Sequence, residues 1–314
     1  MTTLERAIRH VPGFEAMYQK INRRMTLEDK AVSTRTNYCR HIAALALHYD
    51  CVPTDLNIEQ VEDFLYAKLN EKTGVSGQHF KFTIYGLRYA CRVMGKDELR
   101  IKLPVIRRQR KLPVVLSKDE IKMMLNKPSR LKYRVMIALL YGCGLRLNEV
   151  RNLKLEDIDL DRSVLHVRKS KGRKDRYMPL GHTLTDILGS YIKINKPFNW
   201  LFPGYRSNMS NRFYTEFEQP YGKRSIQWAI KRAAQLAGIK KPVNVHSLRH
   251  TFATHLLEDG VNILTIKELL GHASIRTTMI YLHVAQVDNR QRRSPLDSLN
   301  GVEVIRNTQG EFSF

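Results

Sequence analysis

The stretch that decides the fold and the chemistry of this chain is His246-Ser-Leu-Arg249-His250, followed by Leu270-Gly271-His272 and then by Tyr281. An arginine stays protonated at working pH and can bind phosphate oxygens through paired hydrogen bonds. A tyrosine beside such cations can act as a nucleophile towards phosphorus. Upstream, Gly144-Leu-Arg146-Leu-Asn-Glu149 supplies a second arginine where a turn meets a helix. Together these residues indicate a site that breaks a phosphodiester through a tyrosine.

The spacing of the two histidines around Arg249 admits other interpretations. His246, Arg249 and His250 fall on one helical face, at positions i, i+3 and i+4. His-x-x-x-His is also a zinc spacing, but Ser247 stands where the metalloprotease motif carries glutamate, and no carboxylate or cysteine ligand lies nearby in sequence. We therefore expect no metal. Taken singly, His250 can be a buried structural residue, and one tyrosine among fourteen is more often core than catalyst. The hypothesis of a nucleophilic tyrosine therefore rests on the order of all these motifs along the chain and not on any single residue.

The charge of the chain points to a polyanionic partner. The 314 residues carry 53 Lys and Arg against 30 Asp and Glu, a formal net charge of +23. Such an excess attracts nucleic acid or an anionic membrane. No apolar run approaches the roughly 18–20 residues of a membrane span, and the first residues lack the apolar core of a signal peptide. We expect a cytoplasmic protein that binds nucleic acid and not membrane, with Cys39, Cys51, Cys91 and Cys143 reduced.

Apolar periodicity predicts a mainly α-helical chain in two domains. A helical domain covers residues 1–103, a basic linker residues 104–116, and a second domain residues 117–314. Asn57 with Gln60, and Ser117 with Glu120, have the spacing of capping boxes, while Ser33 and Thr34 are candidate caps. Helices are expected at residues 38–49, 58–69, 78–94, 118–126, 130–142, 183–194, 224–237, 247–258, 262–270 and 275–285, with one more carrying Glu149.

Two basic segments are candidates for phosphate contact. The linker holds basic residues between Pro104 and Pro113 without any acid, which fits either a solvated hinge or, as the global charge favours, a strap along a phosphate backbone. The segments 164–168 and 176–180 alternate like two strands of a small antiparallel sheet, joined by a turn at Lys171-Gly172. Charge alone does not decide which hairpin lysine matters. The candidate DNA-binding residues are Arg107, Arg108, Arg110, Lys111, Arg173 and Lys174.

The ordered motifs resemble those of the tyrosine recombinase (phage integrase) family, with the Xer and integron-type site-specific recombinases nearest. The resemblance spans essentially the whole chain, through Gly144-Leu-Arg146, Lys171-Gly-Arg-Lys174, His246-Ser-Leu-Arg249-His250, Leu270-Gly271-His272 and Tyr281. It implies a helical core-binding domain and a catalytic domain that close as a clamp on duplex DNA, with a C-terminal tail that docks on a neighbouring protomer.

The resemblance also implies a role for each motif residue. Tyr281 would attack the scissile phosphate, form a 3′-phosphotyrosyl bond and release a 5′-hydroxyl. Arg146 and Arg249 would hold the non-bridging oxygens, and Lys171 would protonate the leaving oxygen. His246 and His272 would assist by proton transfer and hydrogen bonding. Glu149 and His250 would support these catalytic residues without contacting the substrate. Because the phosphotyrosyl bond keeps the energy of the phosphodiester, neither ATP nor a metal cofactor is needed.

The implied partner is double-stranded DNA carrying an inverted-repeat recombination site, bound by a homotetramer on two synapsed sites. Two alternatives remain. A type IB topoisomerase uses a similar site without synapsis of two duplexes, and a DNA-binding accessory protein would lack catalysis. The sequence does not give the target site, nor whether integration, excision or dimer resolution results.

Overall fold

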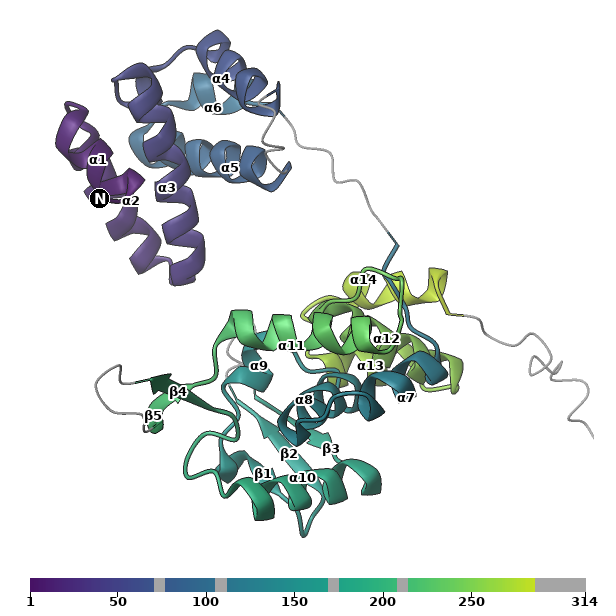
Figure 1. Cartoon of the computed structure of the whole chain (residues 1–314). Helices are drawn as coiled ribbons and strands as arrows, with labels where there is room; N and C mark the ends of the chain where they lie inside the picture. Colours follow the sequence, from purple (N-terminus) through teal and green to yellow (C-terminus); the bar gives the residue numbers. More distant parts are fainter. Residues whose placement is uncertain (71–76, 105–111, 169–174, 208–213, 286–314) are drawn as a thin grey trace, which may run out of the picture. The chain divides into compact units, whose positions relative to one another are not determined.

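The computed structural model describes residues 1–70, 77–104, 112–168, 175–207 and 214–285. The chain divides into two compact units, Met1–Arg110 and Lys111–Phe314, so the division falls inside the basic segment 104–116. Both units are dominated by helices, with small antiparallel sheets in the second (Figure 1). The predicted mainly α-helical class with a small antiparallel sheet is therefore confirmed. Among the described residues, no helix is long and apolar enough to cross a membrane.

The first unit is all-helical in its described residues. The Asn57–Gln60 capping box is present, with the Asn57 amide donating to Gln60 Oε1 at 2.9 Å and the Gln60 amide donating to Asn57 Oδ1 at 2.8 Å. The candidate caps Ser33 and Thr34 were wrong, because Ala31 is the N-cap and provides no side-chain bond. The helices are α1 (Thr3–His10), α2 (Phe14–Leu27), α3 (Val32–Tyr49), α4 (Ile58–Asn70), α5 (Gly77–Met94) and α6 (Asp97–Lys102), with a 3₁₀ turn at Pro53–Asp55.

The second unit is built around α8 (Leu131–Gly142), whose stretch from Val135 to Leu140 is buried throughout. The Ser117–Glu120 capping box begins α7 (Lys118–Asn126), as predicted. An antiparallel sheet in the order β1 (Ile158–Asp159), β2 (Val164–Val167), β3 (Arg176–Pro179) includes the predicted strand pair, with Val167 opposite Arg176. The other elements are α9 (Leu147–Arg151), a 3₁₀ turn (Leu155–Asp157), α10 (His182–Asn195), β4 (Pro203–Ser207), β5 (Tyr214–Pro220), α11 (Lys223–Leu236), α12 (Val245–Glu258) and α13 (Ile263–Leu270).

The segment expected as one helix at 275–285 is divided in two. A single α-helical turn, α14 (Ile275–Thr278), passes into a 3₁₀ helix (Met279–His283) that carries Tyr281. Threonine has a low helix propensity because its branched side chain is restricted in a helix. Thr278 is also fully buried, and its Oγ1 lies 2.9 Å from His272 Nδ1, so a tertiary contact holds this turn.

Gly144, between α8 and α9, brings the backbone close to α12. Its φ is +55°, a region that side chains with a Cβ disfavour. A Cβ at this position would lie 2.3 Å from Cδ1 of Phe252 and 3.1 Å from Cδ2 of Leu270. The turn therefore needs glycine for conformation and for space.

We expect Gly144→Ala to lower the free energy of unfolding by about 2–5 kcal/mol, combining a left-handed backbone penalty with overpacking. Gly238→Ala is the matched control, since Gly238 has a φ of +69° but nothing within 4 Å of the added Cβ. It should cost only the backbone penalty, about 1–2 kcal/mol. Urea unfolding of both variants measures the difference. Equal losses would mean that the clash with Phe252 is relieved without cost.

Candidate active site

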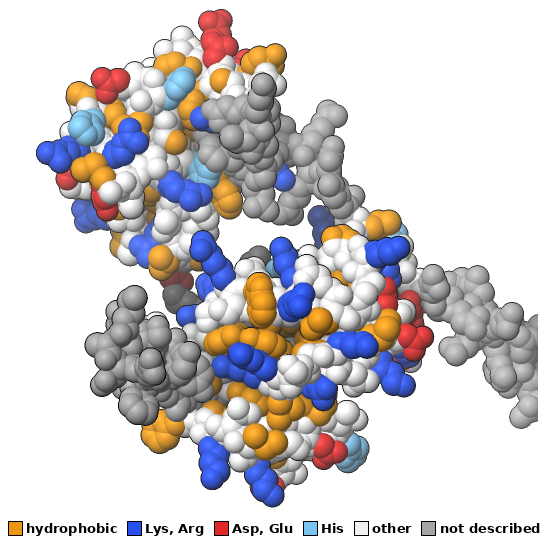
Figure 2. Space-filling view, viewed as in Figure 1, with side chains coloured by type: hydrophobic (Ala, Val, Ile, Leu, Met, Phe, Trp, Pro, Cys, Tyr) orange, Lys and Arg blue, Asp and Glu red, His pale blue; other side chains and the backbone are white. Residues whose placement is uncertain are grey.

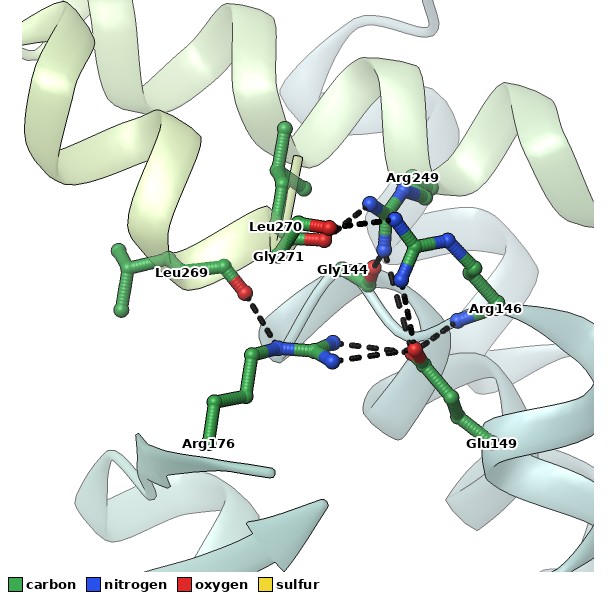
Figure 3. A network of polar contacts seen from close by, with 8 residues as sticks. All are labelled: Gly144, Arg146, Glu149, Arg176, Arg249, Leu269, Leu270 and Gly271. Atoms are coloured by element: carbon green, nitrogen blue, oxygen red, sulfur yellow. Dashed lines mark hydrogen bonds and ion pairs between the residues drawn. The ribbon is translucent and has the colours of Figure 1, made fainter. Parts of the chain in front are cut away.

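Arg146 lies where the turn after α8 enters α9, and Glu149 in the first turn of that helix holds it. The backbone amide and Nη1 of Arg146 donate to the two carboxylate oxygens of Glu149, each at 2.8 Å. Nη2 of Arg146 donates to the carbonyl of Gly271 at 3.0 Å (Figure 3). The guanidinium is thus fixed to its own helix and to the end of α13, in a partly exposed position.

Arg249 comes from α12 and is almost fully buried, with 3% of its surface exposed. Its Nη1 donates to the carbonyl of Gly144 at 2.6 Å, and its Nη2 donates to the carbonyl of Leu270. Burial and the charge of Arg146 lower the pKa of the Arg249 guanidinium to about 9, which leaves it protonated at neutral pH. The two predicted arginines therefore converge from separate helices onto one site.

Arg176 is a third arginine of this cluster, and its role was missed from sequence. Its Nη1 and Nη2 donate to the two oxygens of Glu149 at 3.0 and 2.9 Å, and its Nε donates to the carbonyl of Leu269 at 2.7 Å. In the sequence analysis it was named only as the first residue of the predicted strand 176–180. The usable signal was the two-residue period of β3, which puts Arg176 on the same face as Met178, a residue with 1% of its surface exposed.

Three arginines therefore surround one carboxylate. Burial alone would raise the pKa of Glu149, but the hydrogen bonds and charge of Arg176, with those of Arg146, hold this pKa at about 2. Glu149 is consequently ionised at neutral pH. Three guanidiniums against one carboxylate leave two excess positive charges, which suits the site to an anion.

The end of α13 takes part through its backbone. The carbonyls of Leu269, Leu270 and Gly271 accept hydrogen bonds from Arg176, Arg249 and Arg146 respectively (Figure 3). These groups belong to the last turn of the helix, where carbonyls lack partners within the helix. The backbone directs the three cations without adding a second carboxylate that would compete with a bound anion.

The histidines and Tyr281 lie beside this cluster. Tyr281 has 1% of its surface exposed, and its hydroxyl lies 3.1 Å from Nδ1 of His250. Burial raises the pKa of Tyr281, while the charges of Arg249 and Arg146 reduce that rise. Nδ1 of His272 lies 2.9 Å from Oγ1 of Thr278, directly after the left-handed Gly271 that ends α13.

All three histidines are held in the neutral state. Burial, followed by the charge of Arg249, lowers the pKa of His246 and brings that of His272 to about 3. Burial, followed by His246 and then Arg249, brings the pKa of His250 to about 4. At neutral pH each ring can therefore accept a proton or donate one hydrogen bond.

The structure brings together seven of the residues expected from sequence: Arg146, Glu149, His246, Arg249, His250, His272 and Tyr281. Lys171, Arg173 and Lys174 of the hairpin, and Arg107, Arg108, Arg110 and Lys111 of the linker, lie outside the described residues. In the described part of the chain, no group of three His, Cys, Asp or Glu side chains is arranged to hold a metal ion.

A groove of about 950 Å³ borders the site at His246. Its lining includes the exposed side chains of Arg224, Trp228 and Lys231 on α11, and also Lys241 and Asn244. On the face shown in Figure 2, basic side chains (blue) are more prominent than acidic ones (red). The cations of this groove make it suited to an anionic ligand.

The ion pair between Arg176 and Glu149 gives a prediction for stability. We expect Arg176→Met to lower the free energy of unfolding at pH 7 by about 3–5 kcal/mol, because it leaves a buried carboxylate with fewer compensating charges. Lys118→Met, which breaks an exposed pair with Asp259, is the control and should leave the free energy of unfolding nearly unchanged, because solvent screens the pair.

Acidification tests the origin of that loss. The folded pKa of Glu149, about 2, lies below the unfolded value of roughly 4.3. Ionised Glu149 therefore stabilises the folded state fully above the unfolded pKa, and this stabilisation is lost as pH falls towards 2. The gap between Arg176→Met and the parent should narrow between pH 7 and pH 3 in urea-unfolding experiments. A gap independent of pH would indicate lost packing and not lost charge.

Comparisons with known proteins agree with this geometry. Residues 114–287 match the Phage integrase family. A putative integrase/recombinase, y4qK, of Sinorhizobium fredii is 34% identical over 283 residues, covering 90% of this chain and 88% of the relative. The tyrosine recombinase XerA of Thermococcus kodakarensis is 38% identical over 233 residues, covering 73% of this chain and 78% of XerA. In the fold, the Tn1549 transposon integrase in complex with a circular intermediate DNA is similar with a TM-score of 0.64 at 17% identity, covering 84% of this chain and 94% of that one. The chain belongs to the phage integrase family.

Proposed function

We propose that this protein is a site-specific DNA recombinase that cuts and rejoins DNA strands through Tyr281. The observation that carries the proposal is the convergence of Arg146, Arg249 and Tyr281, from three separate helical elements, on a site with excess positive charge. Membership of the phage integrase family and the similarity to tyrosine recombinases support the same activity.

In the proposed reaction, the Tyr281 oxygen attacks the scissile phosphorus. A bond forms between that oxygen and phosphorus while the bond from phosphorus to the 5′ oxygen breaks, which leaves a 3′-phosphotyrosyl link and a 5′-hydroxyl. The transition state gathers negative charge on the non-bridging oxygens, and Arg146 and Arg249 are fixed in advance to meet it. A 5′-hydroxyl from a partner duplex then reverses the step.

The other site residues have supporting roles in this proposal. Lys171 donates a proton to the departing 5′ oxygen, and His246 and His272 assist by hydrogen bonding and proton transfer. Glu149 positions Arg146, to which it is bound by two hydrogen bonds. The phosphotyrosyl bond stores the energy for rejoining, so the proposed reaction uses neither ATP nor a metal ion.

Duplex DNA is the proposed substrate, consistent with the groove beside His246 and the net charge of +23. The basic linker and hairpin would contact phosphates, and the two units would close around the duplex. The XerH recombinase, similar in fold with a TM-score of 0.59 at 18% identity, was solved bound to a palindromic substrate. We propose that the site bound by this chain is also an inverted repeat. We further propose that the chain acts in the cytoplasm as a homotetramer on two synapsed sites, with its C-terminal tail joining protomers.

Tyr281→Phe should abolish the covalent complex with DNA because the attacking oxygen is gone. It should keep the parental affinity and the same steep fall of affinity with salt, since phosphate contacts are unchanged. Denaturing gel electrophoresis of a trapped nicked substrate measures the adduct, and a salt series measures binding. Tyr177→Phe, at an exposed position on β3, is the control and should form the adduct normally. An adduct in Tyr281→Phe, mapped to Tyr214 or Tyr221, would overturn the assignment.

Lys171→Ala should fail on ordinary DNA but cleave a substrate whose bridging 5′ oxygen is sulfur at nearly the parental rate. A thiolate leaves without a proton because its conjugate acid is far stronger than an alcohol. Arg249→Ala should stay slow on both substrates, since its proposed contacts are with non-bridging oxygens. If sulfur rescues Lys174→Ala or Lys169→Ala and not Lys171→Ala, the general acid is another residue of the hairpin.

A further inference from the structure

His250 contacts the tyrosine that the proposed reaction uses as its nucleophile. The Tyr281 hydroxyl and Nδ1 of His250 are 3.1 Å apart, within hydrogen-bonding distance, and the ring centroids are 5.7 Å apart. His250 follows Arg249 directly on α12, so the same helix supplies a cation and a proton acceptor. In the sequence analysis, His250 had only a supporting role, whereas His246 and His272 were expected to take part in proton transfer.

The two other histidines are arranged differently around the phenol. His272 directs its Nδ1 to Thr278, at 2.9 Å. His246 lies one turn before His250 on α12, with its ring centroid 6.5 Å from that of His250. A candidate base must lie within about 2.6–3.2 Å of the atom that carries the proton it removes. His250 meets this requirement in the structure.

We propose that His250 is the general base that accepts the proton of Tyr281 when its oxygen attacks phosphorus. The inference rests on the proposed function, since it takes Tyr281 as the nucleophile. With the ring proton on Nε2, the Tyr281 O–H donates to Nδ1. As the bond from oxygen to phosphorus forms, the proton passes to Nδ1, while the departing 5′ oxygen receives its own proton from the general acid. In rejoining, the imidazolium returns the proton to the Tyr281 oxygen.

A bound phosphate would strengthen His250 as a base. Without an anion, burial, His246 and Arg249 hold the pKa of His250 at about 4, so the ring is neutral and able to accept. A phosphate held by Arg146 and Arg249 would offset the positive charge that faces the ring, and the pKa of His250 would rise. The base would thus become stronger when the substrate is in place.

The test compares two substitutions of His250. His250→Asn places an amide oxygen near the position of Nδ1, so it can accept the hydrogen bond but cannot take the proton. His250→Ala removes both capacities. We expect each to slow formation of the covalent complex in single turnover by roughly 10²–10⁴-fold, the usual contribution of general base catalysis. Binding of uncleaved DNA should remain close to that of the parent.

His255 provides a matched control on the same helix. It is buried, and its Nδ1 lies 2.9 Å from the hydroxyl of Tyr141 on α8. His255→Asn therefore removes a similar histidine–tyrosine pair and should leave the rate of cleavage unchanged. The melting temperatures of the variants show how much of any effect is loss of folding.

Added imidazole provides a second measurement. It should accelerate His250→Ala in proportion to its concentration, and it should not accelerate His250→Asn, in which the side chain fills the space. Parental rates in His250→Asn would overturn the proposal and leave His250 a positioning residue for the phenol. Faster cleavage by His250→Ala would also overturn it and identify the contact as a latch on Tyr281. Either result, with Tyr281→Phe inactive, would leave the proposed function standing, whereas an adduct in Tyr281→Phe would remove the basis of both.

Discussion

The buried carboxylate of Glu149 is the constraint on which the site depends. Arginines from β3, from α12 and from the turn that enters α9 surround this group, and each is also bound to a carbonyl at a helix end or turn. Guanidiniums repel one another, and burying several of them together is costly in the absence of an opposing charge. Glu149 supplies that charge and stays ionised because the pKa is held at about 2. The substrate phosphate would then add to a set of cations that is already assembled.

The helical architecture could be predicted from sequence because it rests on local signals. The capping boxes at Asn57 and Ser117 and the continuous apolar run of α8 are each contained within a few residues. The short 3₁₀ helix of Tyr281 was not predicted, and the contact of Thr278 with His272 just before it carries no local sequence signal. The hairpin of β4 and β5 was missed as well, since polar residues interrupt any clear period-2 pattern in its sequence.

In the site, too, some residues could be identified from sequence motifs, whereas others are brought together only by packing. The identity of Arg146, Arg249 and Tyr281 could be predicted because the order of several motifs is informative even when each motif is weak. Arg176 could not be separated from its basic neighbours by charge, although the inward period of β3 marked it. The contact between His250 and Tyr281 joins residues 31 positions apart, and only the packing of α12 against the 3₁₀ helix creates it.

The end of α13 has a consequence for how this sequence can vary. Three successive backbone carbonyls each accept a hydrogen bond from a different arginine, so the end of α13 makes these contacts without its side chains. The side chains at Leu269 and Leu270 can therefore drift among residues that preserve the core without disturbing the cations. The number of residues cannot drift in the same way, because one inserted residue would turn each later carbonyl by about 100° around the helix axis. For the two leucines, we therefore expect the number of residues to be constrained more strictly than their identity, whereas Gly271 is also required for its left-handed backbone.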